Sequence, residues 1–312
     1  MVETRSGSVL DHWLTQLVCP LDHAPLTRAA DGTWQCTSCA FTAPLVTVND
    51  RQVYDFRALN IPQTVQLEFC IPVQPLDRYE VVRTMFRAPA EATKQPPVNV
   101  AIKTKLDPGS QHYLRTLYEQ HGPNLRILDL GCGSGDNRKF LNAIGFTNVI
   151  GVDWSAKGAD ILVDAHRLPF AAGTFDVVVS TAVFEHLYNP FLAMHNIARV
   201  STPRAWFVGG ASFWEAWHGS SYFHFTPDGW QTLLNQNGYQ LQDLWTGWGV
   251  IPAALAHVFT PGHFRKFGYG LQRLVEGVFR LWGGDAGVRK LQLRASGAYI
   301  VFAARTQSNG VT

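Results

Sequence analysis

The feature that most constrains the fold is a glycine-rich segment, LDLGCGSG, at residues 128–135. It continues a short apolar run, 126–130, whose composition is typical of a buried parallel strand. Gly131, Gly133 and Gly135 let the backbone turn sharply and approach a ligand without clashes from Cβ atoms. Dinucleotide enzymes use a similar loop, so the loop alone predicts a nucleotide-like ligand and no particular one.

Strand-like and helix-like segments alternate from about residue 109 onward. Asn189-Pro190 and Thr226-Pro227 each place a capping side chain before a proline that suits the first turn of a helix. The alternation predicts an α/β fold built on a doubly wound, mostly parallel sheet. The other predicted strands lie at 148–152, 161–163, 175–180, 205–210, 239–245 and 298–304.

Four motifs stand in a fixed order along this part of the chain: LDLGCGSG, GVD, DAHRLPF and FDVVVSTAVFEHL. In this order they resemble the class I (Rossmann-like) methyltransferases that depend on S-adenosylmethionine. The resemblance covers about 109–246 and the last strand. It implies a seven-stranded sheet with an antiparallel finish, and S-adenosyl-L-methionine as the cofactor.

The resemblance also implies roles for individual residues in cofactor binding. The glycine loop would lie against the methionine part, Asp153 would bind the ribose, and Trp154 would pack on the adenine face or lie in the core. The full set of expected cofactor-binding residues is Asp129, Gly131, Gly133, Gly135, Asp153, Trp154, Asp164 and Ala165.

One departure from the usual pattern concerns the connection between Asp153 and Asp164, which leaves little room for a helix. Members of the family with this short crossover carry a later segment similar to FWEAWHGSSYFHFTPDGW at 213–230. Many of them resemble enzymes of polysaccharide or secondary-metabolite pathways, which hints at a biosynthetic role.

A cysteine cluster precedes this domain. Cys19, Cys36 and Cys39 have the spacing of a zinc ribbon, with Asp22 or His23 as the fourth ligand. The segment resembles small zinc-ribbon activators of RNA and protein methyltransferases, which implies a structural zinc; a metal-free module with free thiols is the alternative. We expect a zinc-ribbon-like module at 1–60, a proline-rich linker or lid at 61–108, and a methyltransferase domain at 109–312 with a helical insertion at about 247–294.

Methyl transfer to a hydroxyl requires that the acceptor lose its proton, usually to a histidine or a carboxylate. The candidate catalytic residues are His218, His224 and His186, of which His218 is the first choice because it follows the fifth strand, where such folds build the acceptor pocket. His186, within FEHL, is equally suited to a structural role. The Asn/Asp-Pro-Pro-Tyr turn used on base amino groups has no counterpart after the fourth strand, where STAVFEHL stands.

The distribution of charge along the chain indicates which classes of partner it can bind. The net charge is +2, and residues 1–60 carry four basic and six acidic side chains, a poor phosphate-binding surface, which argues against nucleic acid as a partner. The segment 262–294 carries seven basic and two acidic residues. This amphipathic stretch predicts a lid, a peripheral contact with anionic lipid or a phosphorylated carrier, or simply a solvated basic face.

The sequence therefore favours an O-methyltransferase that acts on a small-molecule, glycan or lipid-linked acceptor. An rRNA or tRNA methyltransferase is the alternative, and a non-catalytic scaffold is the second. Five unevenly spaced cysteines and the lack of a signal-peptide pattern or an apolar run of about 20 residues fit a cytoplasmic protein. The pattern predicts no particular oligomeric state.

Overall fold

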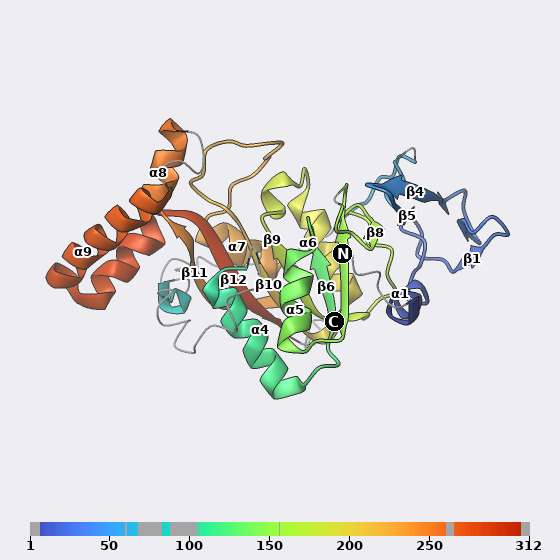
Figure 1. Ribbon diagram of the computed structural model, residues 1–312, viewed down its shortest axis with the longest axis horizontal. Helices are drawn as coiled ribbons and strands as arrows, with labels where there is room; N and C mark the ends of the chain where they lie inside the picture. Colours follow the sequence, from blue (N-terminus) through green and yellow to red (C-terminus); the bar gives the residue numbers. More distant parts are fainter. Residues whose placement is uncertain are drawn as a thin grey trace.

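The computed structural model describes residues 7–59, 61–67, 83–87, 104, 106–155, 157–259 and 265–306. A nine-stranded sheet forms the centre, in the order β11-β12-β10-β9-β6-β7-β8-β5-β4 (Figure 1). The strands are β4 (Leu45–Val48), β5 (Arg51–Asp55), β6 (Arg126–Leu130), β7 (Asn148–Asp153), β8 (Ile161–Leu162), β9 (Phe175–Thr181), β10 (Ser201–Ser212), β11 (Tyr239–Gly249) and β12 (Ser296–Arg305).

Seven of these strands, β8 to β11 in the sheet order, form the doubly wound sheet that the sequence predicts. All neighbours among them are parallel except at β12, which runs antiparallel to β10 and β11. The sheet is larger than the predicted seven strands because Tyr54 and Asp55 of β5 pair with Ile161 and Leu162 of β8. An open strand edge is thereby covered by the N-terminal segment.

Alternate residues of the central strands point to opposite faces, and each face has its own helices. Ile127 and Val177 pack with α4 (Pro108–His121) and α5 (Asp136–Ile144). Their neighbours Leu128 and Val178 belong to a larger core with α6 (Pro190–Val200) and α7 (Pro227–Asn235). Both α6 and α7 begin at the predicted Asn189 and Thr226 caps. Because both faces are buried, the strands read as continuous apolar runs.

The N-terminal segment packs against the same core. It comprises α1 (Gly7–Leu14) and a small sheet of β1 (Leu26–Arg28), β2 (Trp34–Cys36) and β3 (Thr42–Ala43). Trp13 is fully buried and stacks on Phe175 of β9, with 5.2 Å between ring centroids. Of the predicted linker or lid at 61–108, most residues lie outside those described. Within it, Phe86 is buried and forms a bridge with Leu244 of β11.

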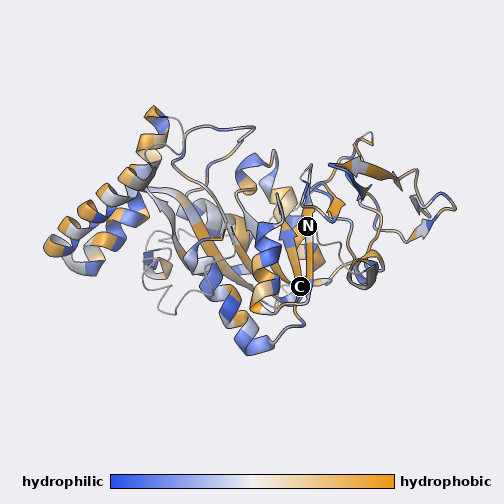
Figure 2. Cartoon of the chain, viewed as in Figure 1, coloured by the Kyte–Doolittle hydropathy of each residue, from blue (hydrophilic) through white to orange (hydrophobic). Residues whose placement is uncertain are grey.

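The predicted helical insertion forms a hairpin at the end of the molecule opposite β1 (Figure 1). It consists of α8 (Val250–Val258) and α9 (Arg265–Arg294), and α9 is kinked at Gly284. Glu276 Oε1 accepts hydrogen bonds from Gln272 and Gln292, which ties the two halves of α9 together. Figure 2 shows apolar and polar residues alternating along α9. Among the described helices, none has the length and apolarity that a membrane span requires.

Candidate active site

The glycine loop connects β6 to α5 in a conformation that only glycine adopts readily. Gly131, Gly133 and Gly135 all have positive φ, between 55° and 77°. A Cβ at Gly131 would lie 2.1 Å from Val183 Cγ2, so the segment after β9 closes directly on the loop. The loop therefore has the sharp, glycine-dependent turn that the sequence predicts, and the segment after β9 packs closely against it.

Three residues that the sequence analysis missed, Gly158, Arg138 and Asp160, contact this loop or the strand beside it. Gly158 donates its N–H to Gly133 O at 3.0 Å, and a Cβ at Gly158 would lie 2.4 Å from Gly135 N. Arg138 Nη1 lies 2.5 Å from Oδ1 of the buried Asp160, whose Oδ2 accepts from Gly151 N at 2.8 Å. The signal in the sequence was weak, because Gly158 and Asp160 stand in a short connection with no regular periodicity.

Asp153 and Trp154 lie where β7 ends. Asp153 Oδ2 accepts from Gly133 N at 3.0 Å, and Oδ1 accepts from Ser155 N at 3.1 Å, which fixes the carboxylate against the loop. Trp154 is 50% exposed, so it does not belong to the buried core. Arg57 from the N-terminal segment covers part of it, with Cζ 5.5 Å from the ring centroid.

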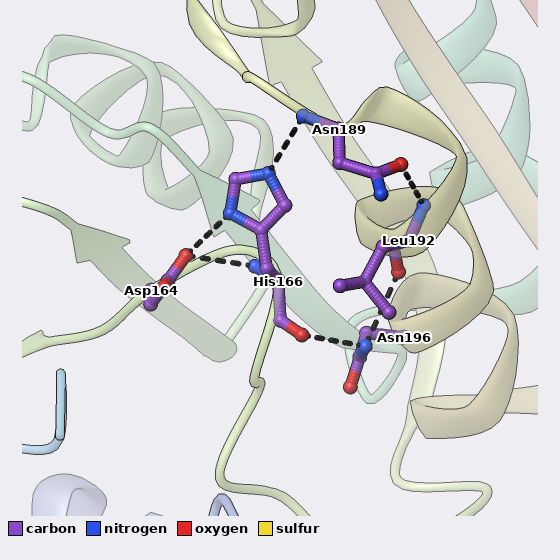
Figure 3. Close-up of polar contacts among 5 residues, drawn as sticks. All are labelled: Asp164, His166, Asn189, Leu192 and Asn196. Carbon is purple, nitrogen blue, oxygen red and sulfur yellow. Dashed lines mark hydrogen bonds and ion pairs between the residues drawn. The ribbon is translucent and has the colours of Figure 1, made fainter. Parts of the chain in front are cut away.

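Asp164 belongs to a buried network that also includes His166 and Asn189 (Figure 3). Its Oδ1 lies 2.6 Å from His166 Nδ1 and accepts the His166 N–H at 2.9 Å. His166 Nε2 accepts the Asn189 N–H at 3.3 Å, so Nδ1 carries the proton. Burial raises the pKa of Asp164, but the His166 hydrogen bonds outweigh it and the pKa is lowered. The predicted neighbour Ala165 is buried beside this network.

Asp129 is fully buried at the end of β6. Asn137 Nδ2 donates to its Oδ1 at 3.3 Å, whereas Oδ2 has no partner among the described residues. Burial raises the pKa of Asp129 to about 7. An unpaired buried carboxylate oxygen is a group that a cationic amino group would satisfy.

Of the three predicted catalytic histidines, two lie close together in the structure and the third lies apart from them. His186, in the short helix η1 (Phe184–His186), and His218, in the segment after β10, approach with 5.3 Å between ring centroids. Glu185 joins them, so that one donor atom from each of the three lies within 4.8 Å of the others. His224 is exposed and stands outside this cluster.

Glu185 is 1% exposed, and burial raises its pKa. Its Oε1 accepts from Ser212 Oγ at 3.1 Å, and the same hydroxyl lies 2.5 Å from Glu215 Oε2. Glu215 Oε1 accepts a hydrogen bond from Trp248 Nε1. Sequence reasoning missed Ser212 and Glu215 because they come into contact with Glu185 only in the folded chain.

The structure brings together the three thiols of the cysteine cluster and one of the two candidate fourth ligands. Cys19, Asp22, Cys36 and Cys39 offer donor atoms that all lie within 4.8 Å of one another. Cys19 Sγ and Cys39 Sγ are 3.6 Å apart, close to the ~3.8 Å expected of two sulfurs bound tetrahedrally at about 2.3 Å from zinc. Asp22 is the fourth member, and His23 lies outside the group.

Comparisons with known proteins found a family match over the segment that contains the glycine loop. Residues 128–209 match a family described as methyltransferase domain. A search of the curated proteins found no significant match.

Solved structures similar to this chain were also found. They include an S-adenosylmethionine-dependent methyltransferase from Mesorhizobium loti, with 14% identity over 63% of this chain and 98% of that chain and a TM-score of 0.41. The YcgJ protein from Bacillus subtilis has 15% identity over 64% and 100% of the two chains, with a TM-score of 0.42. The [4+2]-cyclase SpnF has 16% identity over 77% and 99%, with a TM-score of 0.42.

Similarity at this level adds nothing about substrates. The matched domain, the glycine loop at the carboxyl end of β6 and the antiparallel β12 agree with one another. Residues 128–209 therefore match a methyltransferase domain, within a chain whose central sheet has the Rossmann-like α/β arrangement.

Proposed function

We propose that the protein transfers a methyl group from S-adenosylmethionine to a hydroxyl of a small-molecule, glycan or lipid-linked acceptor in a biosynthetic pathway. The observation that carries the proposal is the contact of Asp153 with the glycine loop, with the buried Asp129 near the carboxyl end of β6 and the half-exposed Trp154 directly after β7. Carboxylates suit the cofactor's amino and ribose groups, and an exposed indole suits a purine face. The cofactor supplies an electrophilic methyl on a sulfonium.

The acceptor side favours an organic substrate with apolar surface. The segment between β10 and α7 exposes aromatic side chains beside the Glu185–His186–His218 cluster, a concentration typical of recognition surfaces. Trp214 of this segment lies against His257 of α8, with 5.1 Å between ring centroids, so the segment adjoins the helical hairpin. The exposed aromatic residues are Trp214, Trp217, Tyr222 and Phe223.

Calorimetric binding of S-adenosylhomocysteine to Asp153→Asn tests the cofactor assignment. We expect at least a tenfold loss of affinity, because hydrogen bonds to a charged group contribute about 1.5–3 kcal/mol. Asp31→Asn is the matched control, since Asp31 also accepts the N–H two residues later (Thr33 N, 3.0 Å) but lies in the turn between β1 and β2. Failure of the wild-type protein to bind S-adenosylhomocysteine would contradict the proposal.

We propose further that α9 rests on an anionic lipid surface, which suits a lipid-linked acceptor. Its apolar residues recur at helical spacing and are exposed, from 37% for Leu271 to 90% for Trp282, so much of the stripe faces away from the protein. Exposed Arg273, Arg280 and Arg289 lie on the same helix, and a basic amphipathic face of this kind binds anionic headgroups. The exposed apolar residues are Phe267, Leu271, Leu274, Val278, Phe279, Leu281 and Trp282.

Cosedimentation with vesicles of phosphatidylcholine alone or with phosphatidylglycerol tests this contact. We expect binding only to the anionic vesicles, and loss of binding in a Leu281→Asp, Trp282→Asp double variant. Leu59→Asp is the control, because Leu59 is 56% exposed on the N-terminal segment. A different outcome would assign the stripe to a second copy of the chain. In that case the protein would not bind vesicles, and it would form a concentration-dependent dimer that the same double variant abolishes.

We propose that Cys19, Asp22, Cys36 and Cys39 bind a structural zinc ion. The short sulfur–sulfur distance supports this, and so do the backbone N–H groups of Ser38 and Cys39 that lie 3.3 and 3.4 Å from Cys36 Sγ. Such N–H contacts stabilise a thiolate ligand. The zinc would hold the small sheet together, since β1 to β3 contain only three, three and two residues.

A further inference from the structure

The cluster of Glu185, His186 and His218 adjoins the cofactor loop. Val183, two residues before Glu185, packs on Gly131, and Ala182 has a φ of 55°, which is unusual for a residue other than glycine. Strained backbone of this kind is concentrated at functional sites. The cluster therefore stands where an acceptor oxygen would meet the methyl group of the proposed cofactor.

The buried carboxylate in this cluster lacks a full set of partners. Glu185 Oε2 has no hydrogen-bond partner among the described residues, although the side chain is 1% exposed. Ser212 has a single hydroxyl proton, yet its Oγ lies within hydrogen-bond distance of both Glu185 and Glu215. At any moment one of the two carboxylates is therefore without that donor.

The charge around the cluster is also unbalanced. Within the described part of the chain, the only ion-pair contact made by Glu185 or Glu215 is the one between Glu215 Oε2 and His218 Nδ1, at 4.0 Å. Two carboxylates beside two imidazoles, with no lysine or arginine paired to them, leave a negative site that a divalent cation would neutralise.

The histidine geometry suits metal binding. His218 Nδ1 lies 2.9 Å from the carbonyl oxygen of Ala216, so the ring donates there and Nε2 keeps its lone pair. Two ligand atoms bound at about 2.0–2.2 Å from one ion are at most roughly 4.4 Å from each other. The three donor atoms of this cluster already lie within 4.8 Å of one another, so small side-chain movements would bring them to one ion. Two imidazoles and one carboxylate leave coordination positions open for substrate.

We propose that Glu185, His186 and His218 bind a divalent transition-metal ion that coordinates the acceptor oxygen; this inference rests on the proposed methyl transfer. The cation lowers the pKa of the coordinated hydroxyl, whose proton leaves to water. The acceptor oxygen then forms a bond to the methyl carbon as the carbon–sulfur bond breaks. The electron pair of the broken carbon–sulfur bond stays on sulfur and converts the sulfonium to a neutral thioether. In this arrangement His218 is a ligand and not the proton acceptor, and Glu215 orients the site.

Titration of the full-length protein with Mn²⁺, followed by electron paramagnetic resonance, tests the inference. Mn²⁺ avoids thiolates, so the cysteine cluster does not contribute. We expect one Mn²⁺ per chain, and a loss of affinity of at least about tenfold in His218→Ala. His224→Ala is the matched control for metal affinity, because His224 is exposed in the same segment but outside the cluster. Glu185→Gln, which keeps an acceptor for Ser212, should weaken binding equally while the circular dichroism spectrum is unchanged.

S-adenosylhomocysteine binding, measured on the same proteins before Mn²⁺ is added, distinguishes failure of the metal inference from failure of the proposed methyl transfer. If the cofactor product binds but Mn²⁺ does not, or if His218→Ala binds Mn²⁺ as the wild type does, the metal inference is overturned and methyl transfer stands. If neither binds, both are overturned.

Discussion

Arg57 and Trp154, which lie 97 residues apart in the sequence, meet just beyond the carboxyl end of β7. Arg57 Nη1 donates to the Trp154 carbonyl at 3.0 Å, its guanidinium lies over the indole, and Asp55 holds the same guanidinium at 2.6 Å. The segment that carries the cysteine cluster thus reaches the residue expected to pack on adenine. If the proposed cofactor binds beside Trp154, the N-terminal segment contributes to its site through Arg57.

We expect Arg57→Ala to weaken S-adenosylhomocysteine binding several-fold, because a cation–π contact contributes roughly 0.5–2 kcal/mol and the indole would lose its backing. Calorimetry measures the change. Arg51→Ala is the matched control: Arg51, in β5, also donates to a main-chain carbonyl of the segment after β7, but to Lys157 O at 2.9 Å and not to Trp154 O. An equal loss in Arg51→Ala would show that the contacts only dock the N-terminal segment.

Gly131→Ala should destabilise the protein and abolish cofactor binding. An alanine at this positive φ destabilises the folded state by about 1–2 kcal/mol, because its Cβ crowds the backbone. The same Cβ also overlaps Val183 Cγ2. Gly173 has a similar φ of 68°, and a Cβ added there would have no atom within 4 Å, so Gly173→Ala isolates the backbone cost. Denaturant unfolding should give a clearly larger loss for Gly131→Ala, and equal losses would contradict the steric account.

Asp129→Asn should stabilise the free protein more at pH 8 than at pH 4.5. Because the pKa of Asp129 rises from about 3.9 in the unfolded chain to about 7, the folded state binds the proton more tightly. Stability is therefore lost as the pH rises from about 4 to about 7, by on the order of 4 kcal/mol, and the amide removes that loss. Thermal unfolding at the two pH values measures it. A difference independent of pH would mean that the carboxyl does not titrate in this range.

Removal of zinc with a chelator should lower the midpoint of thermal unfolding by roughly 5–10 °C, because a ligand that binds only the folded state stabilises it. The Asp22→Ala variant should lose zinc affinity, whereas His23→Ala should retain it, since His23 lies outside the four-residue group. Metal content after dialysis provides the measurement. Retention of zinc by Asp22→Ala with loss in His23→Ala would reverse the assignment of the fourth ligand.

Local patterns account for the parts of the fold that were predicted correctly. The apolar run before Gly131, the Asn189 and Thr226 caps and the spacing to Asp153 each act within a few residues, so their physical effect is visible in the sequence. The covering of β8 by β5 was not predicted. It pairs Tyr54 with Ile161 across more than a hundred residues, and no local preference encodes that contact.

The sequence by itself determined the α/β sheet, the glycine loop and the three thiols of the cysteine cluster, because periodicity and short spacings restrict the backbone directly. The structure decided between Asp22 and His23 as the fourth member of the cluster. Only the tertiary structure decided that His218 joins Glu185 and His186 while His224 does not. It also decided that the apolar stripe of α9 faces outward, since the same helical spacing fits a buried or an exposed face. Such outcomes depend on which surfaces pack together, and packing is a property of the whole chain.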